Sequence, residues 1–153
     1  MTNESVQQVI KEVIFEMVKA AEQYDENGSE EAIHHFKAEL RIIRSFMETI
    51  RIHCGDRGMK MGDKCKKLYQ VASVLVEAYG QLKQLKAQEN KQNSKIAHFE
   101  TVVNSAGNEW KKTYSSAILF KLEKQLLDYN YTKVPPAVLS NLINRRVSQF
   151  EIG

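Results

Sequence analysis

The 153-residue chain contains little that interrupts a helix, since it has only 2 prolines and 7 glycines. Hydrophobic residues make up 42% of the sequence and charged residues 27%, which is ordinary for a folded globular protein and excludes a disordered chain. The length suits one domain with a hydrophobic core of its own. We therefore expect a single all-α domain over residues 1–153, an antiparallel bundle of about five helices.

A membrane-spanning or secretory segment is also missing. No window approaches the ~20 apolar residues of a bilayer span, and residues 1–18 have acids and amides where a secretory signal needs an uninterrupted apolar run. These absences predict a cytoplasmic protein without membrane contact. Cys54 and Cys65 could bridge the connection between two helices, but in that compartment we expect free thiols.

Catalytic and metal-binding signatures are absent as well. The chain has no glycine-rich phosphate loop, no nucleophile elbow and no clustered pair of acids, so we expect neither an enzyme nor a cofactor. A di-iron bundle needs two Glu-x-x-His pairs, and only Glu31 and His34 form one. A metal site is therefore not expected.

The sequence does contain a local excess of positive charge. A net charge of +3 is too small to indicate a specific nucleic-acid partner by itself. Residues 51–67, however, contain six lysines and arginines against only Asp56 and Asp63. The positive field therefore concentrates around one connection between two helices.

Apolar residues at helical spacing predict the first three helices. The first runs from near Asn3 or Ser5 to about Tyr24, and the second from an N-cap at Ser29 to residues 53–54. The third begins at residue 59 or 62, ends near residue 88, and packs antiparallel beside the second.

Two further helices complete the predicted bundle. After a break near residues 90–93, Ser94 caps a long fourth helix that stops near residues 128–131 and is weakened at Gly107. Trp110 and the tyrosines near it fall at helical spacing, which favours core packing. A short last helix covers about residues 136–150, because Pro135 and Pro136 suit a helix start.

The second predicted helix carries a row of bases next to its apolar side. Residues 33–51 read IHHFKAELRIIRSFMETIR, and at ~100° per residue the bases fall within about a quarter-turn of one another. Several cations at fixed spacing suit a repeating polyanion, since each can meet one phosphate. The alternative is a solvated helix edge. The bases of this row are His34, Lys37, Arg41, Arg44 and Arg51.

The third predicted helix adds lysines to the same region. Lys60, Lys64 and Lys67 share one side of it, and an antiparallel hairpin would bring them near the end of the second helix that carries Arg51. We expect both helices to contribute bases to one groove.

The order of histidine and bases resembles a known family signature. His34 followed by bases three, seven and ten residues later (Lys37, Arg41 and Arg44) is similar to the histidine-bearing motif of the conserved histidine alpha-helical domain (CHAD) family. Residues 66–82, KKLYQVASVLVEAYGQL, resemble the LYKxAGxxRD sequence of that family's next helix, with Val76 at the arginine position. The second histidine-arginine signature has no counterpart, because LINRRVSQF (142–150) supplies only two arginines.

The resemblance implies a short or divergent CHAD-like helical bundle that binds inorganic polyphosphate without catalysis. The expected polyphosphate contacts are His34, Lys37, Arg41, Arg44, Arg51, Lys60, Lys64 and Lys67. Without a second half, self-association as a homodimer could complete the groove. The alternative is a helical interaction or adaptor module with no anionic ligand, in which the basic row only keeps the surface solvated.

Overall fold

A computed structural model describes residues 3–90, 92–142 and 144, and within these ranges the regular structure is all helical. No β-strand occurs in the described ranges, so the all-α prediction is confirmed. Residues 136–142 are helical as well. The other elements are α1 (Asn3–Asn27), α2 (Glu30–Cys54), α3 (Asp63–Ala87), α4 (Asn93–Thr113), α5 (Ser116–Leu127) and the 3-10 helix η1 (Tyr131–Lys133).

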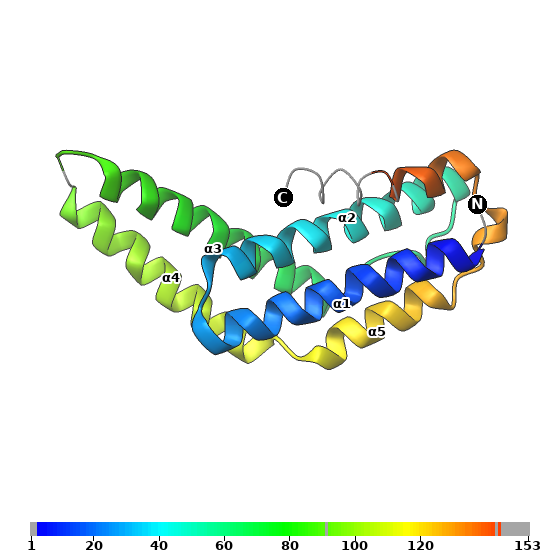
Figure 1. Ribbon diagram of the computed structural model, residues 1–153, viewed down its shortest axis with the longest axis horizontal. Helices are drawn as coiled ribbons and strands as arrows, with labels where there is room; N and C mark the ends of the chain where they lie inside the picture. Colours follow the sequence, from blue (N-terminus) through cyan, green and yellow to red (C-terminus); the bar gives the residue numbers. More distant parts are fainter. Residues whose placement is uncertain (1–2, 91, 143, 145–153) are drawn as a thin grey trace.

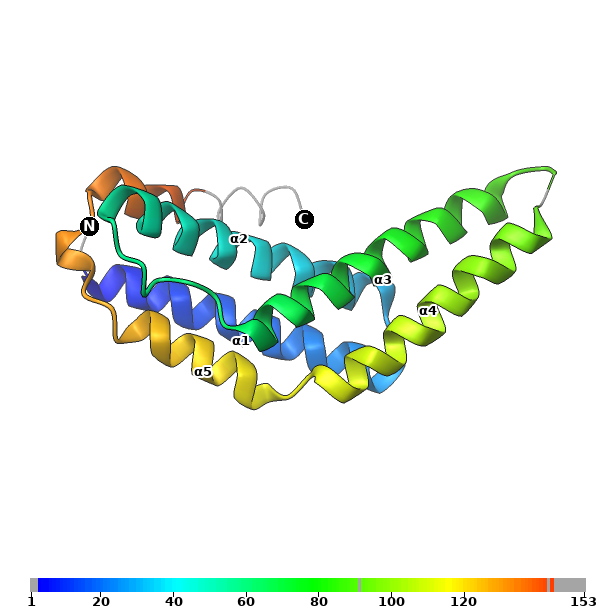
Figure 2. The same ribbon diagram turned by 180° about the vertical axis from the view of Figure 1, so that it is seen from behind.

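The molecule consists of two regions that differ in thickness (Figures 1 and 2). In the first, α1 and α2 form an antiparallel hairpin and α5 runs along α1; we call these helices, with the segment 55–62, the body. In the second, α3 and α4 form an antiparallel pair that projects away from the body, which we call the arm. The chain therefore leaves the body once and returns to it in α5.

Local capping fixes both ends of α2. Asn27 and Gly28 end α1, and Gly28 has a φ of 63°, which suits a residue without a Cβ. The Ser29 hydroxyl accepts a hydrogen bond from the Ala32 amide at 3.2 Å, which confirms the predicted N-cap. Gly55, with a φ of 65°, terminates the helix after Cys54, as predicted.

The predicted apolar stripes of α1 and α2 form the core of the body. All six residues of the α2 stripe are buried. In α1 the predicted stripe is buried apart from half-buried Val18; its buried members are Val6, Ile10, Val13, Ile14, Met17 and Ala21. Removing these side chains from water contributes roughly 25 cal/mol for each Å² of apolar surface. The α2 stripe consists of Ile33, Phe36, Leu40, Ile43, Met47 and Ile50.

The segment 55–62, which we call the connector, departs from the prediction. Instead of a short turn, it runs back along the body in irregular conformation, so α3 begins partway along the body and away from the end of α2 (Figure 2). Met59 and Met61 are buried, whereas Lys60 between them is exposed, as alternate residues of an extended segment require. The two methionines make the connector part of the core, which a turn would not allow.

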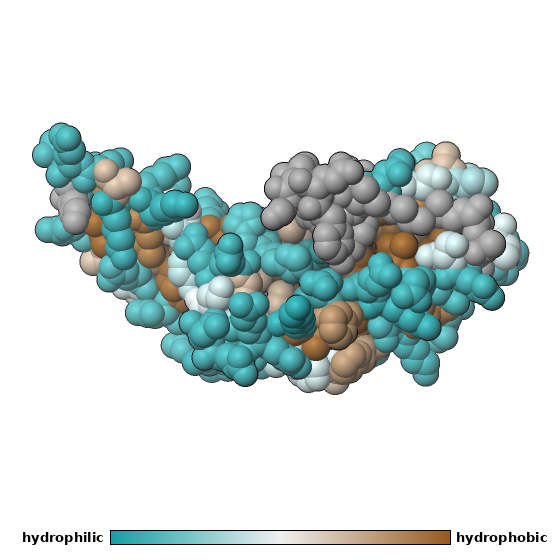
Figure 3. Space-filling view, viewed as in Figure 1, coloured by the Kyte–Doolittle hydropathy of each residue, from teal (hydrophilic) through white to brown (hydrophobic). Residues whose placement is uncertain are grey.

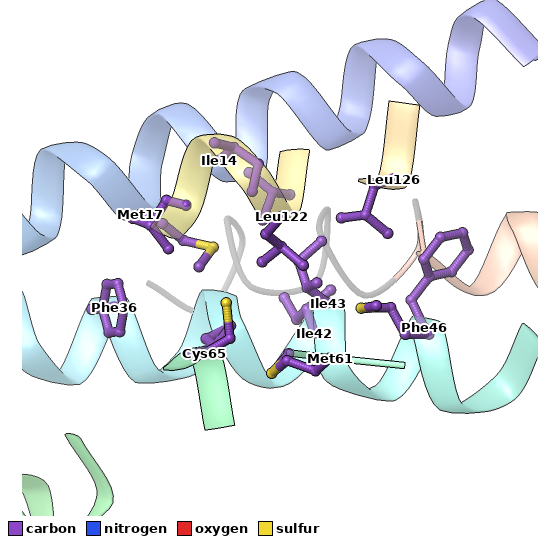
Figure 4. Close-up of a cluster of buried hydrophobic side chains, with 14 of the residues drawn as sticks. Ile14, Met17, Phe36, Ile42, Ile43, Phe46, Met61, Cys65, Leu122 and Leu126 are labelled. Atoms are coloured by element: carbon purple, nitrogen blue, oxygen red, sulfur yellow. The ribbon is translucent and has the colours of Figure 1, made fainter. Parts of the chain in front are cut away.

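The connector is held from both sides. Met61 lies with Ile43 of α2 and Leu122 of α5 in the cluster drawn in Figure 4. The Gln125 side chain donates hydrogen bonds to the carbonyl oxygens of Gly58 (3.3 Å) and Lys60 (2.9 Å). The irregular connector thus covers a side of the body that a helix would cover in a four-helix bundle.

The long fourth helix predicted from the sequence is wrong, because the chain forms two helices there. Helix α4 ends at Thr113, Tyr114 is extended, and Ser115 caps α5 by accepting a hydrogen bond from the Ala117 amide at 3.3 Å. Gly107 lies inside α4 and does not break it. Helix α4 also begins at Asn93, so Ser94 is not its cap.

Aromatic residues join the arm to the body, as predicted for core packing. Trp110 of α4 is fully buried and contacts Tyr24 of α1 (ring centroids 5.6 Å apart) and Phe36 of α2 (4.9 Å) edge-on, and its ring stacks on Tyr114 at 5.2 Å. The Trp110 indole N–H donates to the Asp25 carboxylate at 3.0 Å. Burial, with the nearby acids Glu22 and Asp25, raises the pKa of Tyr114 to about 12. We call this cluster the elbow.

The end of the described chain returns to the body. Tyr131 is buried and donates to the carbonyl of Leu126 at 2.7 Å, and Val138 and Leu142 pack against α2 beside Ile42 and Phe46. The predicted last helix begins as expected, but residues 145–150, with both of their arginines, lie outside the described ranges. None of the described helices is long and apolar enough to cross a bilayer. Both cysteines are free thiols.

Candidate functional site

The bases of the α2 row lie on the solvent side of the helix. His34, Arg41, Arg44 and Arg51 are exposed and Lys37 is half-buried. The buried stripe of α2 lies beside this row on the neighbouring face of the helix, as the hydrophobic periodicity had predicted. The helix rises about 1.5 Å per residue, so the row extends along most of α2 in fixed steps.

Arg44 is the base of this row with a defined contact to the arm. Its guanidinium carbon lies 4.9 Å from the centroid of the Tyr69 ring of α3. A guanidinium stacked on an aromatic face keeps its N–H edges free for an anion while its orientation is restricted. Tyr69 therefore restricts the orientation of the Arg44 side chain, a contact that the search for basic residues missed. Its place in the LYQ sequence of α3 was the available signal.

Acidic side chains surround the histidine end of the row. His34 lines a shallow hollow of about 380 Å³ together with Glu30, Glu31 and Lys83. The two glutamates occupy the first turn of α2, where the helix dipole stabilises negative charge. The local field at His34 is therefore less positive than at the arginines.

The remaining bases of the row have no acidic partner within the described ranges. The pairs of basic and acidic side chains found there are His35 with Glu16 and Glu39 (3.6 Å each), Lys67 with Glu109 (3.5 Å) and Lys86 with Glu100 (3.8 Å). Glu48 is exposed on the same side of α2, between Arg44 and Arg51, and forms none of these pairs. The charges of Lys37, Arg41, Arg44 and Arg51 are therefore not neutralised by an ion pair with an acid of the described ranges.

Two of the three predicted lysines face helices other than α2. Lys67 pairs with Glu109 and lines a hollow between α3 and α4. Lys64 lines a groove between the start of α3 and the α4–α5 junction, in which no α2 residue takes part. Lys60 is exposed on the connector. The structure thus does not bring Lys64 and Lys67 to the α2 row, because the connector and α4 place that side of α3 against other helices.

A separate polar group lies on the other edge of α2. His35 bridges Glu16 of α1 and Glu39, which is the buried acidic residue in the described core. This contact ties α1 to α2 across their interface. In the part of the chain that the structure describes, no group of three or more histidines, cysteines or acids is arranged to hold a metal ion.

Comparisons with known proteins gave no match: no family model fits the chain, and no curated protein and no solved structure is significantly similar to it.

Proposed function

We propose that the protein binds inorganic polyphosphate or a similar linear polyanion along α2, without catalysis. The observation that supports this most is that Arg41, Arg44 and Arg51 are exposed and Lys37 is half-buried on one side of a single helix, with no ion pair from any of them to an acid among the described residues. The likeness of residues 34–44 to the CHAD signature favours the same ligand. A cytoplasmic location stays a prediction.

Pre-positioning of the cations makes this surface suitable for a chain of phosphates. A helix capped at both ends fixes the spacing of its side chains, so binding does not have to order the backbone. Arg41 and Arg44 present forked donors to phosphate oxygens, whereas Lys37 acts as a point charge. Arg44 loses less side-chain entropy than its neighbours, because it already stacks on Tyr69.

The double substitution Arg41→Ala with Arg44→Ala tests the proposal. We expect it to weaken binding of long-chain polyphosphate at least about tenfold, because two charge-assisted contacts are lost. Affinity of the unaltered protein should fall steeply as salt is added, since exposed charges are screened. Titration calorimetry at two salt concentrations measures both effects, and circular dichroism checks that the helices are kept.

A matched control removes the same charge elsewhere. Lys11→Ala with Lys19→Ala takes two exposed cations from α1 and should change the affinity by less than about twofold. If both double variants bind polyphosphate equally well, net charge alone governs binding and the α2 site is rejected. Equal affinity for duplex DNA of the same charge would also contradict a preference for polyphosphate.

A second candidate function is a helical interaction module, which the exposed aromatic residues of the body favour. Phe15 of α1 and Phe120 of α5 are 67% and 52% exposed. The bond from the Gln7 side chain to the Leu127 carbonyl (3.1 Å) sets the antiparallel register, which places the two phenylalanines at about the same level. Figure 3 shows apolar side chains gathered on the face where α1 and α5 run side by side.

Self-association through this face is testable by size-exclusion chromatography with light scattering. A homodimer that depends on it should dissociate in the variant Phe15→Ser with Phe120→Ser, since exposed aromatic residues commonly anchor interfaces. A monomer at all concentrations, or a dimer unaffected by the substitutions, would contradict the hypothesis that this face mediates self-association. Polyphosphate binding of the same variant should be unchanged.

A further inference from the structure

A groove between three helices lies apart from the α2 row. It has a volume of about 610 Å³ and is formed by the first turn of α3, the α4–α5 junction and one side of α5. This volume is in the range of small-molecule sites. No residue of α2 lines the groove, so it is independent of the function proposed above.

Three lysines from three different helices surround the groove. Lys64 belongs to α3, Lys112 to α4 and Lys121 to α5, and all three are exposed at its edge. None of them forms an ion pair with an acid among the described residues. Asp63 is the carboxylate of the lining, so the groove carries three positive charges against one negative charge.

The start of α3 adds to the positive field. Gly62 stands at its N-cap and provides no side-chain acceptor. The Lys66 amide, which donates to the Gly62 carbonyl at 3.0 Å, makes the first bond of the helix, so the amides of Asp63, Lys64 and Cys65 have no helical acceptor. A helix N-terminus with free amides and its dipole favours an anion. Here it supplements the lysines and would not make a site without them.

The floor of the groove is apolar. Cys65 and Leu122 are buried there, and Ile118 and Tyr114 are half-buried. A small inorganic anion would leave this floor in contact with water, whereas an apolar body would cover it. The lysines at the edge therefore suit the charged head of a ligand, and the apolar floor suits its apolar body.

We propose that this groove binds a small amphipathic anion, with a carboxylate or phosphate head at Lys64, Lys112 and Lys121 and an apolar body on Ile118 and Leu122. Both heads share the chemistry that the lysines recognise. The proposal joins residues of α3, α4 and α5, which lie far apart in the sequence and converge at the α4–α5 junction.

Octyl phosphate and octanoate, below their micelle concentrations, are the probes. With the full chain, we expect saturable shifts of the backbone amide signals of residues 62–65 and 113–118 in nitrogen-15 NMR spectra. If only one of the two probes gives these shifts, that probe identifies the preferred head group, and the site is supported. Shifts confined to other residues, or no saturable shifts with either probe, overturn it.

Two further ligands separate the contributions of head and body. Neutral octyl glucoside should bind at least about tenfold more weakly than the preferred probe, because it lacks the charge-assisted contacts. Inorganic phosphate should also bind at least about tenfold more weakly, because it leaves the apolar floor uncovered. Equal affinity for octyl glucoside would refute an anion site, and equal affinity for phosphate would refute an amphipathic one.

Substitutions with a matched control test the residues. Lys64→Gln, Lys112→Gln and Lys121→Gln together should weaken binding at least about tenfold. The control variant carries the same Lys→Gln change at Lys66, Lys111 and Lys124, which are exposed on the same three helices outside the groove. It should bind the probe within about twofold of the unaltered chain. Equal losses in both variants overturn the site. Ala117→Glu, an exposed change in the lining, should weaken binding without any lysine being removed.

Discussion

Helix α2 of the body and helix α4 of the arm have similar lengths, 25 and 21 residues, but bury very different numbers of side chains. Helix α2 has ten buried residues, whereas α4 has only Ala106 and Trp110, both in its C-terminal half. On α3, the contiguous core of the protein ends at Leu75; Ala78, Leu82 and Leu85 are buried but do not join it. The outer arm is therefore a two-helix layer, held by its own contacts.

This difference teaches that helix length says little about stability. A helix in the body is covered on several sides, so its unfolding would expose most of the core. The arm adds two exposed pairs, Lys67–Glu109 beside the elbow and Lys86–Glu100 near the tip, each of which contributes at most about 1 kcal/mol. We expect the body to unfold as one unit and the tip of the arm to open locally at lower free energy.

The largest effect is expected where the two regions meet. Trp110→Ala should lower the free energy of unfolding by about 3–5 kcal/mol, because a fully buried indole that contacts α1, α2 and the α4–α5 junction is lost. Urea denaturation followed by circular dichroism measures the loss. Trp110→Phe, which keeps a ring but not the bond to Asp25, should cost less. A loss below about 1 kcal/mol in Trp110→Ala would mean that the elbow does not couple the regions.

A matched pair of leucines compares the two regions directly. Leu40→Ala in the body should cost about 2–5 kcal/mol of global stability, since Leu40 is fully buried in the contiguous core. Leu85→Ala in the outer arm should cost about 1 kcal/mol or less globally and should mainly speed amide hydrogen exchange near residues 78–87 and 93–104. Equal global losses would show that the arm and the body unfold together.

A smaller effect tests the connector. Gln125→Ala should lower the free energy of unfolding by about 1–2 kcal/mol, because the carbonyls of Gly58 and Lys60 lose their side-chain donor. Gln8→Ala, whose side chain donates to Glu12 on the exposed side of α1, is the control and should change stability by less than about 0.5 kcal/mol. Chemical denaturation of both variants gives the comparison. Similar values would show that the connector is held by its methionines alone.

The smallest expected effect is a pH dependence of the free energy of unfolding, which arises from the buried Cys65 at the start of α3. Burial raises the pKa of the Cys65 thiol from its ordinary 9.0 to about 11. The unfolded chain therefore releases this proton first, and stability that is complete below pH 9 is lost as the pH rises toward 11. Between pH 8 and 10 the loss should be about 1 kcal/mol, and Cys65→Ala should remove that part of the slope. An identical slope in the variant would assign the pH dependence to other groups.

Sequence periodicity predicted those parts of the fold that depend on local signals. The ends of α2 followed from Ser29 and Gly55, and the apolar stripes of α1, α2 and α3 followed from their spacing, with Val18 and Tyr79 as the half-buried exceptions. The break at Tyr114 was missed, because Ser115 as a cap looks like any other serine within a helical pattern. Gly107 seemed the weaker point, yet a half-buried glycine in a packed helix costs only about 1 kcal/mol.

For the candidate site, the sequence predicted which bases share a helix face but not which helices that face meets. The exposed side of α2 matches the expected row. Lys64 and Lys67 were assigned to the same groove on the assumption of a tight hairpin, and the buried Met59 and Met61 overturn that assumption. The grouping of Lys64 with Lys112 and Lys121 depends on contacts between distant segments, which no local pattern contains.

The connector also limits where the arm can leave the body. Because an extended chain spans at most about 3.3–3.6 Å per residue, the length of 55–62 sets an upper limit on the distance between the end of α2 and the start of α3. The point at which the arm departs therefore depends on a segment that belongs to no helix.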